Sequence, residues 1–366
     1  MTKLDLKYSF KEKELGKNFR KMDVERVKKL IDSSTSFSVV GMPAMGISIF
    51  LRYLCTTSLA YFIHVDINEL SELSATGFLK LLWKELGNKK KLELLVKKNR
   101  RVVLVFNRFD QLQKYFTREF FANLRSIRDI DKEKIVMIFA ANRPLVEEVP
   151  KALDGGNLTM FSQTYFLAPY SPDELIELIK INSPELLKVE NLNRAIELSG
   201  GHYQLLQLLL RSEYQGDFFS DPAIELQLAQ LYGFLNYREK KWLQKLVLGK
   251  NLPKTEEFLL KTGFVNRGRN EVLEPFTPLL AMYIKKNLRV QLPKKEMELF
   301  LLLRDKTGRV VTKEEIFATL WPQDSDGATD WALNALVYRL RKNSTFVASG
   351  YEIESQKKVG YVLVRA

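Results

Sequence analysis

The sequence of 366 residues is poor in side chains that form disulfides or bind zinc: it has one cysteine, Cys55, and two histidines, His64 and His202. A single cysteine cannot form an internal disulfide, and these three residues are too few for a structural zinc site. No apolar run approaches the roughly 20 residues needed to cross a bilayer, and the first residues contain no apolar signal segment. We therefore expect a cytoplasmic protein without membrane contacts, metal or disulfides.

Positive charge is abundant, with a formal net charge of +13 and a pI near 9.5. Charge of this sign favours polyanionic partners. Its distribution is uneven, because residues 231–291 carry twelve Lys and Arg against five Asp and Glu, whereas residues 292–366 carry twelve against ten. The excess of positive charge in residues 231–291 indicates either auxiliary contacts to phosphates or a solvated surface.

Short apolar runs alternate with helical patterns over residues 34–170. The runs expected to form strands are residues 37–40, 61–67, 101–106, 134–142 and 164–169. Near-continuous apolar strands separated by helices predict a parallel sheet that is covered by helices on both faces. Residues 1–33 precede this region and predict a basic amphipathic helix with Phe19, Met22, Val27 and Leu30 interleaved among lysines.

From Ser171 onward the pattern becomes helical. Ser171 is followed by Pro172, a combination typical of an N-cap and first helical turn, and helices are expected over residues 171–230. Residues 231–290 predict further helices and then two short strands around a polar turn, which is the outline of a small winged helix. Its candidate DNA contacts are Arg267 and Arg269.

Residues 291–366 repeat this outline more clearly. A first helix is expected over residues 293–304, and Thr312 with Glu315 predicts a capping box at the start of a second one. A third helix is expected over residues 329–343, followed by a hairpin. The buried stripe of the third helix is expected to be Leu333, Leu336, Val337 and Leu340.

The outer face of that third helix carries polar and basic side chains, and the turn of the hairpin is basic. In a major groove, guanidinium groups can pair with guanine or phosphates and an asparagine can read adenine. A basic hairpin beside such a helix suits the minor groove or its phosphates. The candidate DNA contacts are Asn334, Tyr338, Arg339, Arg341, Lys342, Lys357 and Lys358.

This segment resembles the OmpR/PhoB-type effector domain of bacterial response regulators. The resemblance rests on TGRVVTKEEI (307–316), LW (320–321), VYRLRK (337–342) and KKVGYVL (357–363), in the family's order and spacing. It implies a winged helix that places its third helix in the major groove and commonly binds direct repeats as a dimer. Arg339 and Arg341 match the family's helix arginines and Lys357 its basic wing residue, whereas Tyr338 replaces a residue that is often basic. A winged helix used only for protein contacts is the alternative.

A different motif follows the first expected strand. Gly41 to Ser48 have the spacing of a phosphate-binding loop, G-x4-G-K-[ST], but Ile47 replaces the lysine. After the strand at residues 101–106, Asn107 and Arg108 stand where the Mg²⁺-binding aspartate and catalytic glutamate are needed. We therefore expect no ATP hydrolysis. The candidate nucleotide contacts, if ATP binds at all, are Gly41, Gly46, Ser48 and Asn142.

Residues 1–290 as a whole resemble the STAND/AAA-like ATPases, which are akin to Orc/Cdc6 initiators. The signs are the loop, FDQL (109–112), ANRP (141–144) and FLAPYSPDELIELI (166–179), followed by ELSGGHYQLLQLLL (197–210) and a winged-helix pattern. The resemblance implies a nucleotide-binding α/β domain with a helical lid. The replaced positions leave two interpretations of this domain, nucleotide binding without turnover or a purely structural role.

Together these patterns predict a multidomain α/β plus winged-helix protein, in which a parallel sheet with a P-loop-like turn and a helical lid precedes two winged-helix domains. We expect a prokaryotic transcriptional regulator that binds duplex DNA sequence-specifically and forms homo-oligomers on it. The alternatives are a nucleotide-gated switch of the STAND/AAA-like kind and an initiator-like DNA-organising protein.

Overall fold

The computed structural model describes residues 10–57, 59–98, 101–154, 156–161, 163–212, 218–252, 256–268, 271–287, 293–321, 329–343, 346, 351–357 and 359–365. The chain divides into two compact units, Met1–Tyr283 and Ile284–Ala366. None of the described helices is both long and apolar enough to cross a membrane.

The first unit is built around a five-stranded parallel sheet with the strand order β2-β3-β4-β1-β5. The strands are β1 (Phe37–Val40), β2 (Tyr61–Asp66), β3 (Val102–Asn107), β4 (Ile135–Ala141) and β5 (Gln163–Phe166). Every residue of β1, β3 and β4 is buried, which explains why these segments are apolar without alternation. The predicted parallel sheet is confirmed.

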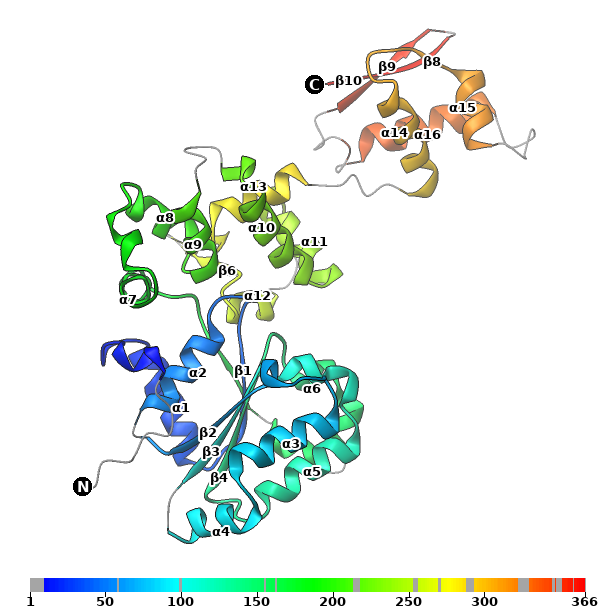
Figure 1. Ribbon diagram of the computed structural model, residues 1–366. Coiled ribbons are helices and arrows are strands. Elements are labelled where there is room, and N and C mark those ends of the chain that lie inside the picture. Colours follow the sequence, from blue (N-terminus) through cyan, green and yellow to red (C-terminus); the bar gives the residue numbers. More distant parts are fainter. Residues whose placement is uncertain are drawn as a thin grey trace. The chain divides into compact units, whose positions relative to one another are not determined.

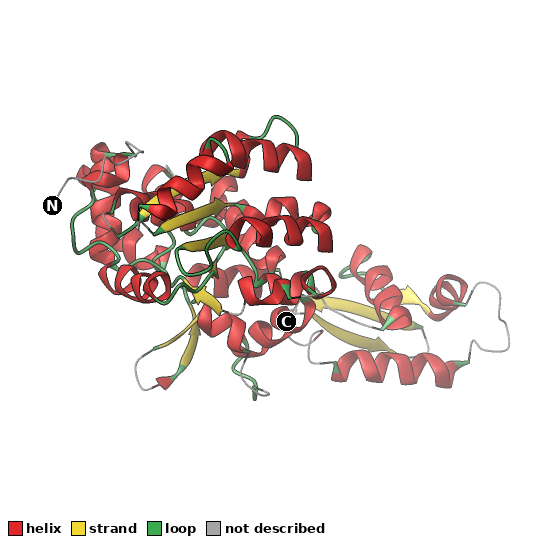
Figure 2. Cartoon of the chain, turned by 90° about the horizontal axis from the view of Figure 1, so that it is seen from below, coloured by secondary structure: helices red, strands yellow, loops and turns green. Residues whose placement is uncertain are grey.

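Helices cover both faces of this sheet (Figures 1 and 2). On one face, side chains of α3, α4 and α5 share a core with alternate residues of the strands. Phe78 of α3, for example, lies in this core with Phe106 of β3 and Phe139 of β4. On the other face lie α1 and α2. The helices of this region are α1 (Lys21–Asp32), α2 (Ile47–Thr56), α3 (Ala75–Leu86), α4 (Lys89–Lys97), α5 (Arg118–Arg128) and α6 (Leu145–Glu148). The short 3-10 segments of this unit are η1 (Lys11–Glu14), η2 (Ile67–Glu69), η3 (Phe109–Tyr115), η4 (Pro150–Leu153), η5 (Asn157–Met160), η6 (Pro184–Lys188) and η7 (Phe218–Ser220).

The first helix differs from its prediction. It begins only at Lys21, and Met22, which was expected on the apolar face, is 61% exposed. The buried residues of α1 are Val27 and Ile31, one helical turn apart, and Phe19 is buried ahead of the helix. The expected apolar face was therefore wrong at Met22, because five helical positions separate it from Val27 and turn it away from the buried face.

The rest of the first unit is mainly helical, as predicted. Ser171 caps α7, and its side chain and that of Glu174 form a capping box. A short antiparallel hairpin of β6 (Val265–Arg267) and β7 (Leu273–Pro275) also agrees with the expectation. That residues 231–290 form a winged-helix domain of their own stays a prediction. The helices are α7 (Pro172–Asn182), α8 (Leu192–Ser199), α9 (Tyr203–Arg211), α10 (Pro222–Phe234), α11 (Tyr237–Val247), α12 (Glu257–Lys261) and α13 (Pro278–Lys286).

A buried ion pair joins the sheet to α11. Arg143, which follows β4, contacts Glu239 of α11 with 2.6 Å between Nη2 and Oε2, and the two side chains are only 14% and 4% exposed. The guanidinium carbon of Arg143 also lies 4.6 Å and 4.3 Å from the ring centroids of Phe234 and Phe258. Glu239 additionally completes the capping box of its own helix. These contacts fix α11 against the carboxyl end of β4.

The second unit is a winged helix. It contains α14 (Lys294–Asp305), β8 (Val311–Thr312), α15 (Lys313–Leu320), α16 (Asp330–Lys342), β9 (Tyr351–Gln356) and β10 (Gly360–Arg365), and its antiparallel sheet has the order β8-β10-β9. The predicted buried stripe of α16 is confirmed. Thr312 caps α15 as expected, but the side chain of Glu315 contacts Lys306 instead of completing a capping box.

Candidate functional site

The outer face of α16 and the hairpin β9–β10 form one candidate surface in the second unit. Because the apolar stripe of α16 faces the core, the remaining residues of the helix are presented to solvent. The five predicted contacts on this helix, Asn334, Tyr338, Arg339, Arg341 and Lys342, are all exposed. A hollow of about 680 Å³ lies along this face and is lined by residues of α16 together with Ser355 of β9 and Tyr361 of β10.

Three of the predicted DNA contacts are engaged within the protein. Arg341 donates from Nε and Nη2 to the carbonyl oxygen of Ile353, at 3.1 and 2.7 Å, and from Nη2 to Ser355 Oγ at 2.8 Å. Arg341 therefore holds α16 to the wing strand β9. These partners lie twelve and fourteen residues further along the chain, and the pattern within the helix does not reveal them.

The other two engaged residues connect α16 to its remaining neighbours. Asn334 Oδ1 accepts a hydrogen bond of 2.6 Å from the hydroxyl of Tyr361 in β10. Arg339 Nε lies 3.1 Å from Oε1 of Glu296, a carboxylate of α14 that is only 7% exposed. The positions of both side chains are thus set by the fold of the second unit.

One exposed residue of this surface was missed by the sequence analysis. Trp331 is 80% exposed, and Tyr338, two helical turns further along, is 63% exposed. The spacing of seven residues places both rings on one face of α16. The signal was present in the sequence, because Trp331, Asn334 and Tyr338 follow the i, i+3, i+7 spacing of a single helical face.

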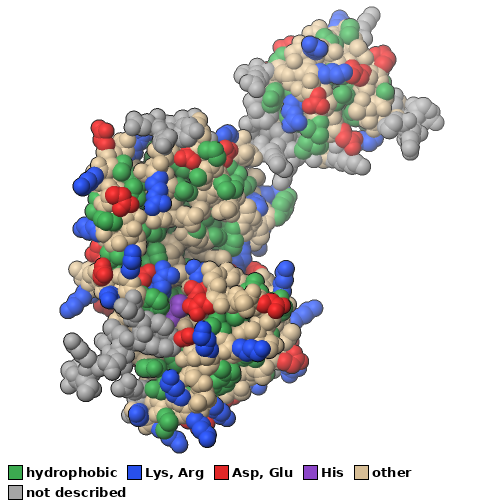
Figure 3. All heavy atoms as spheres, viewed as in Figure 1, with side chains coloured by type: hydrophobic (Ala, Val, Ile, Leu, Met, Phe, Trp, Pro, Cys, Tyr) green, Lys and Arg blue, Asp and Glu red, His purple; other side chains and the backbone are tan. Residues whose placement is uncertain are grey.

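The remaining predicted contacts are basic. Lys357 is exposed at the turn of the β9–β10 hairpin, and Lys342 Nζ lies 6.0 Å from the ring centroid of Tyr338. Arg267, at the end of β6, forms an exposed ion pair of 2.8 Å with Glu271. Lys358 and Arg269 lie outside the described residues. On the face drawn in Figure 3, the Lys and Arg side chains of the first unit are scattered among acidic ones.

A second candidate site lies at the carboxyl ends of the parallel strands in the first unit. In the turn between β1 and α2, Gly46 has a φ of 117°. A Cβ atom at Gly46 would lie 2.5 Å from the hydroxyl oxygen of Tyr170, so this position requires glycine. The same hydroxyl donates to the carbonyl oxygen of Gly46 at 3.1 Å. Gly41 lies directly after β1.

His202 fixes the other side of this turn. Its Nε2 donates to the carbonyl oxygen of Pro43 at 2.8 Å, and its Nδ1 accepts from the amide of Leu205 at the start of α9. Because Pro43 offers only an acceptor and Leu205 only a donor, the neutral ring satisfies both partners. Burial accordingly lowers the pKa of His202 from 6.5 to about 4.

Next to this turn lies a cavity of about 660 Å³. It extends from the loop and the ends of β3 and β4 to the inner face of α9, which contributes Tyr203 and Arg211. The predicted residues Gly46, Ser48 and Asn142 line it, together with Ile47. The structure thus brings three of the four predicted nucleotide contacts to one cavity.

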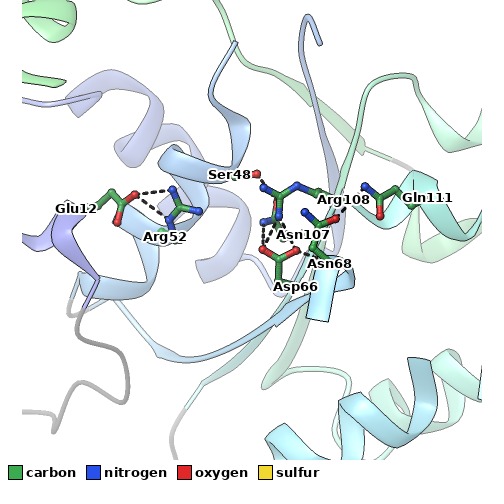
Figure 4. A network of polar contacts seen from close by, with 8 residues as sticks. All are labelled: Glu12, Ser48, Arg52, Asp66, Asn68, Asn107, Arg108 and Gln111. Carbon is green, nitrogen blue, oxygen red and sulfur yellow. Dashed lines mark hydrogen bonds and ion pairs between the residues drawn. The ribbon is translucent and has the colours of Figure 1, made fainter. Parts of the chain in front are cut away.

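The carboxyl ends of β2 and β3 are connected to the first turn of α2 by a continuous polar network (Figure 4). Ser48 Oγ donates to Asn107 Oδ1 at 2.9 Å, and Asn107 Nδ2 donates to Asp66 Oδ2 at 2.9 Å. Arg108 Nη1 reaches both carboxylate oxygens of Asp66, at 2.6 and 2.5 Å. Asn107 and Arg108, which were expected at the positions of a magnesium-binding aspartate and a catalytic glutamate, are therefore paired with groups of the protein itself.

The two carboxylates of this region have different environments. Burial opposes the ionisation of Asp66, but hydrogen bonds from Arg108, the amide of Asn68 and Asn107 outweigh it, and the pKa of Asp66 is lowered. For Asp110 the balance is reversed: burial raises its pKa although Asn142 donates to it from its backbone amide and from Nδ2, at 3.1 and 2.9 Å. Asp110 thus positions Asn142 in the cavity wall.

These residues do not fit a magnesium ion. Mg²⁺ is held by carboxylate and phosphate oxygens in nearly octahedral geometry. Here the available oxygens are the hydroxyl of Ser48 and the amide oxygen of Asn107, and the hydroxyl donates its hydrogen bond to that amide oxygen. The carboxylate of Asp66 is paired with the guanidinium of Arg108. Within the described part of the chain, no group of three or more His, Cys, Asp or Glu side chains could hold a metal ion.

Comparison with known protein families bears on the second unit. Residues 287–363 match the family model described as transcriptional regulatory protein, C terminal. The second unit therefore contains a DNA-binding domain of the OmpR/PhoB type. This confirms the resemblance inferred from the sequence. No curated protein matches the chain.

Several solved structures are similar to the chain. One is a Walker-type ATPase of Pyrococcus abyssi, with 14% identity, a TM-score of 0.47, and coverage of 73% of this chain and 95% of that one. Another is the ORC1 protein of Aeropyrum pernix in complex with DNA, with 11% identity, a TM-score of 0.38, and coverage of 94% and 88%. Cdc6p from Pyrobaculum aerophilum has 14% identity and a TM-score of 0.38 over 78% of this chain and 98% of that one. Identities and TM-scores this low carry no conclusion on ligand or activity.

Proposed function

We propose that this chain regulates transcription by binding specific duplex DNA through α16 and the β9–β10 hairpin, without hydrolysing ATP. The observation that carries the proposal is the outer face of α16, which presents Trp331, Tyr338 and Lys342 to solvent, while Lys357 is exposed at the turn of the β9–β10 hairpin. A helix of this kind fits a major groove, and lysines beside it are placed to meet phosphates. The protein would then act in the cytoplasm, as a homo-oligomer on repeated sites.

Selection from random duplex DNA by the full chain tests this function. A regulator should enrich one motif, repeated at a spacing of about 10–11 base pairs if two copies bind side by side. The Lys342→Ala variant should bind the enriched site more weakly, with a less steep salt dependence, because one phosphate contact is lost. Lys97→Ala, which removes an exposed lysine of α4, is the matched control and should bind like the unaltered protein. A flat selection would contradict the regulator proposal and favour a DNA-organising role.

The proposed absence of hydrolysis rests on the network around Asp66. Ile47 supplies no charge to a terminal phosphate, Asn107 cannot replace a magnesium-binding carboxylate, and Arg108 cannot act as a general base. Phosphate release from ATP by the full chain should therefore equal that of a buffer blank. Turnover that requires this chain would contradict the proposal.

A second candidate function, nucleotide binding without turnover, is favoured by the cavity beside the loop. Arg108 and Arg211 line this cavity, and Arg108 meets Asp66 through Nη1 alone, so its Nε and Nη2 take no part in that pair. Because the site does not fit magnesium, we expect any nucleotide to bind equally well with EDTA. ATP at 100 times its dissociation constant should stabilise the chain by about 2.7 kcal/mol. A melting temperature that is unchanged by ATP, with and without Mg²⁺, would eliminate this candidate.

A further inference from the structure

The aromatic rings on the outer face of α16 lie beside side chains that could be expected to read bases by hydrogen bonding. Arg341 pairs with guanine most effectively through two N–H groups on one edge of its guanidinium. Its Nε and Nη2 already donate to the carbonyl oxygen of Ile353. Asn334 and Arg339 are held by Tyr361 and Glu296 in a similar way. These side chains set the position of α16 relative to the wing and to α14.

Alongside its polar residues, α16 presents two large aromatic side chains to solvent. Trp331 and Tyr338 are 80% and 63% exposed, although large aromatic side chains usually gain from burial. Ala335 lies between them on the same helical face, and its small side chain leaves space between the two rings. Large exposed apolar side chains that gather on one face are typical of a binding surface.

Two exposed lysines of the second unit favour DNA as the occupant of this face. Lys342 lies beside Tyr338, and Lys357 is exposed at the hairpin turn. In a major groove, thymine is the base that presents an apolar group, its 5-methyl, and small or aromatic side chains contact that methyl directly. Trp331, Ala335 and Tyr338 form an apolar part of the wall of the hollow, whose other lining residues include Asn334, Arg339, Arg341 and Ser355. This apolar part has the chemistry for a methyl group, and the lysines would meet the phosphates.

We propose that Trp331 and Tyr338 are the specificity-determining residues of α16 and that they select thymine through contact with its 5-methyl group. Arg341, Asn334 and Arg339 are positioning residues. They hold α16 in the orientation, relative to the wing, that contact with DNA requires. The inference rests on the proposed binding of duplex DNA by α16, and it adds the base that is read and the residues that read it.

The test uses duplexes enriched from random DNA by the full chain, with single thymines replaced by deoxyuridine. This replacement removes only the methyl group, so contact with Trp331 predicts a loss of affinity of about fourfold at the affected position. The Trp331→Ala variant should bind the thymine duplex more weakly and should no longer distinguish thymine from uracil. Trp331→Phe should retain part of the discrimination. Tyr115→Ala, which truncates an exposed ring in the first unit, should behave like the unaltered chain.

The outcomes separate this inference from the function on which it rests. Tight binding to an enriched motif, with no effect of uracil at any thymine or with no thymine in the motif, would overturn the inference and leave DNA binding intact. If the full chain retained no DNA in the selection, the proposed function itself would be overturned. A Trp331→Ala variant with unchanged DNA affinity but a smaller oligomer would assign the rings to contact with a second copy and overturn the inference. Because Trp331 is mostly exposed, its truncation should leave the melting temperature nearly unchanged.

Discussion

The ion pair between Arg143 and Glu239 should be one of the strongest single contacts of the first unit. Both side chains are largely buried, and Glu239 Oε1 and Oε2 meet Nη1 and Nη2 of Arg143 at 2.8 and 2.6 Å. In Glu239→Gln, Arg143 loses its counter-charge between the rings of Phe234 and Phe258. Leaving one partner of a buried pair unpaired costs about 3–5 kcal/mol. We expect a loss of about 3 kcal/mol in the free energy of unfolding, since Arg143 keeps some solvent contact.

A double-mutant cycle isolates the contribution of the pair itself. Arg143→Met should destabilise the unit by a similar amount, whereas the double variant should cost little more than either change alone, which gives a coupling free energy of about 2–3 kcal/mol. Urea unfolding followed by tryptophan fluorescence is a suitable assay, because Trp242 is buried in the same helix as Glu239. The exposed pair Arg267–Glu271 is the matched control, with an expected coupling below about 0.5 kcal/mol. If the two cycles gave equal coupling, burial would not have the effect assigned to it here.

The remaining predictions concern the loop, the wing and the pH dependence of stability. His202 stays neutral in the folded state, with a pKa of about 4 against 6.5 when unfolded, so its contribution is complete above pH 6.5 and is lost as the pH falls toward 4. His202→Asn should therefore flatten the pH dependence of the free energy of unfolding in that window, because the lowered pKa of His202 corresponds to about 3 kcal/mol. An unchanged pH dependence would contradict a neutral, buried His202. Lys357→Ala should lower the salt dependence of DNA binding by about 0.9, measured as the slope of log affinity against log salt, and an unchanged slope would place the residue away from phosphate. Arg341→Ala should weaken binding by misplacing the wing, and it should also lower the melting temperature, which a residue that only contacts DNA would not do. Ile47→Lys should not restore ATP turnover, because the groups at the end of β3 are unchanged, and any release of phosphate above the blank would refute this reasoning.

The sequence was sufficient to predict the sheet and most helices because the signal for each is local. The strands are buried on both faces, so nearly every residue in them is apolar, and Ser171 and Thr312 cap helices through partners three residues away. The apolar stripe of α16 follows from helical periodicity alone. The sequence did not show that α1 begins only at Lys21. Lysines occur before and after Met22, and lysine is compatible with a helix in both places.

The candidate contacts were predicted less completely, because their environments depend on distant segments. Arg339 and Glu296 are 43 residues apart, and Asp66 and Arg108 are 42 apart. Only the fold brings such partners together, so the sequence could place Arg339 on the outer face of its helix but could not reveal its partner. Trp331 is a different case, since extending the helical face by one turn toward Thr329 would have found it.

The network that joins Ser48, Asn107, Asp66 and Arg108 has a consequence for control of the protein. In an ordinary nucleotide switch, the empty site leaves charges and loop amides unsatisfied, and loading the site changes the stable arrangement. Here the ends of β2 and β3 are already bonded to one another and to the first turn of α2. If no nucleotide binds there, the domain would keep the same arrangement whether ATP is scarce or plentiful. Occupancy of the DNA would then follow the number of protein copies in the cell rather than its energy state, and control of synthesis and degradation would set the regulatory output.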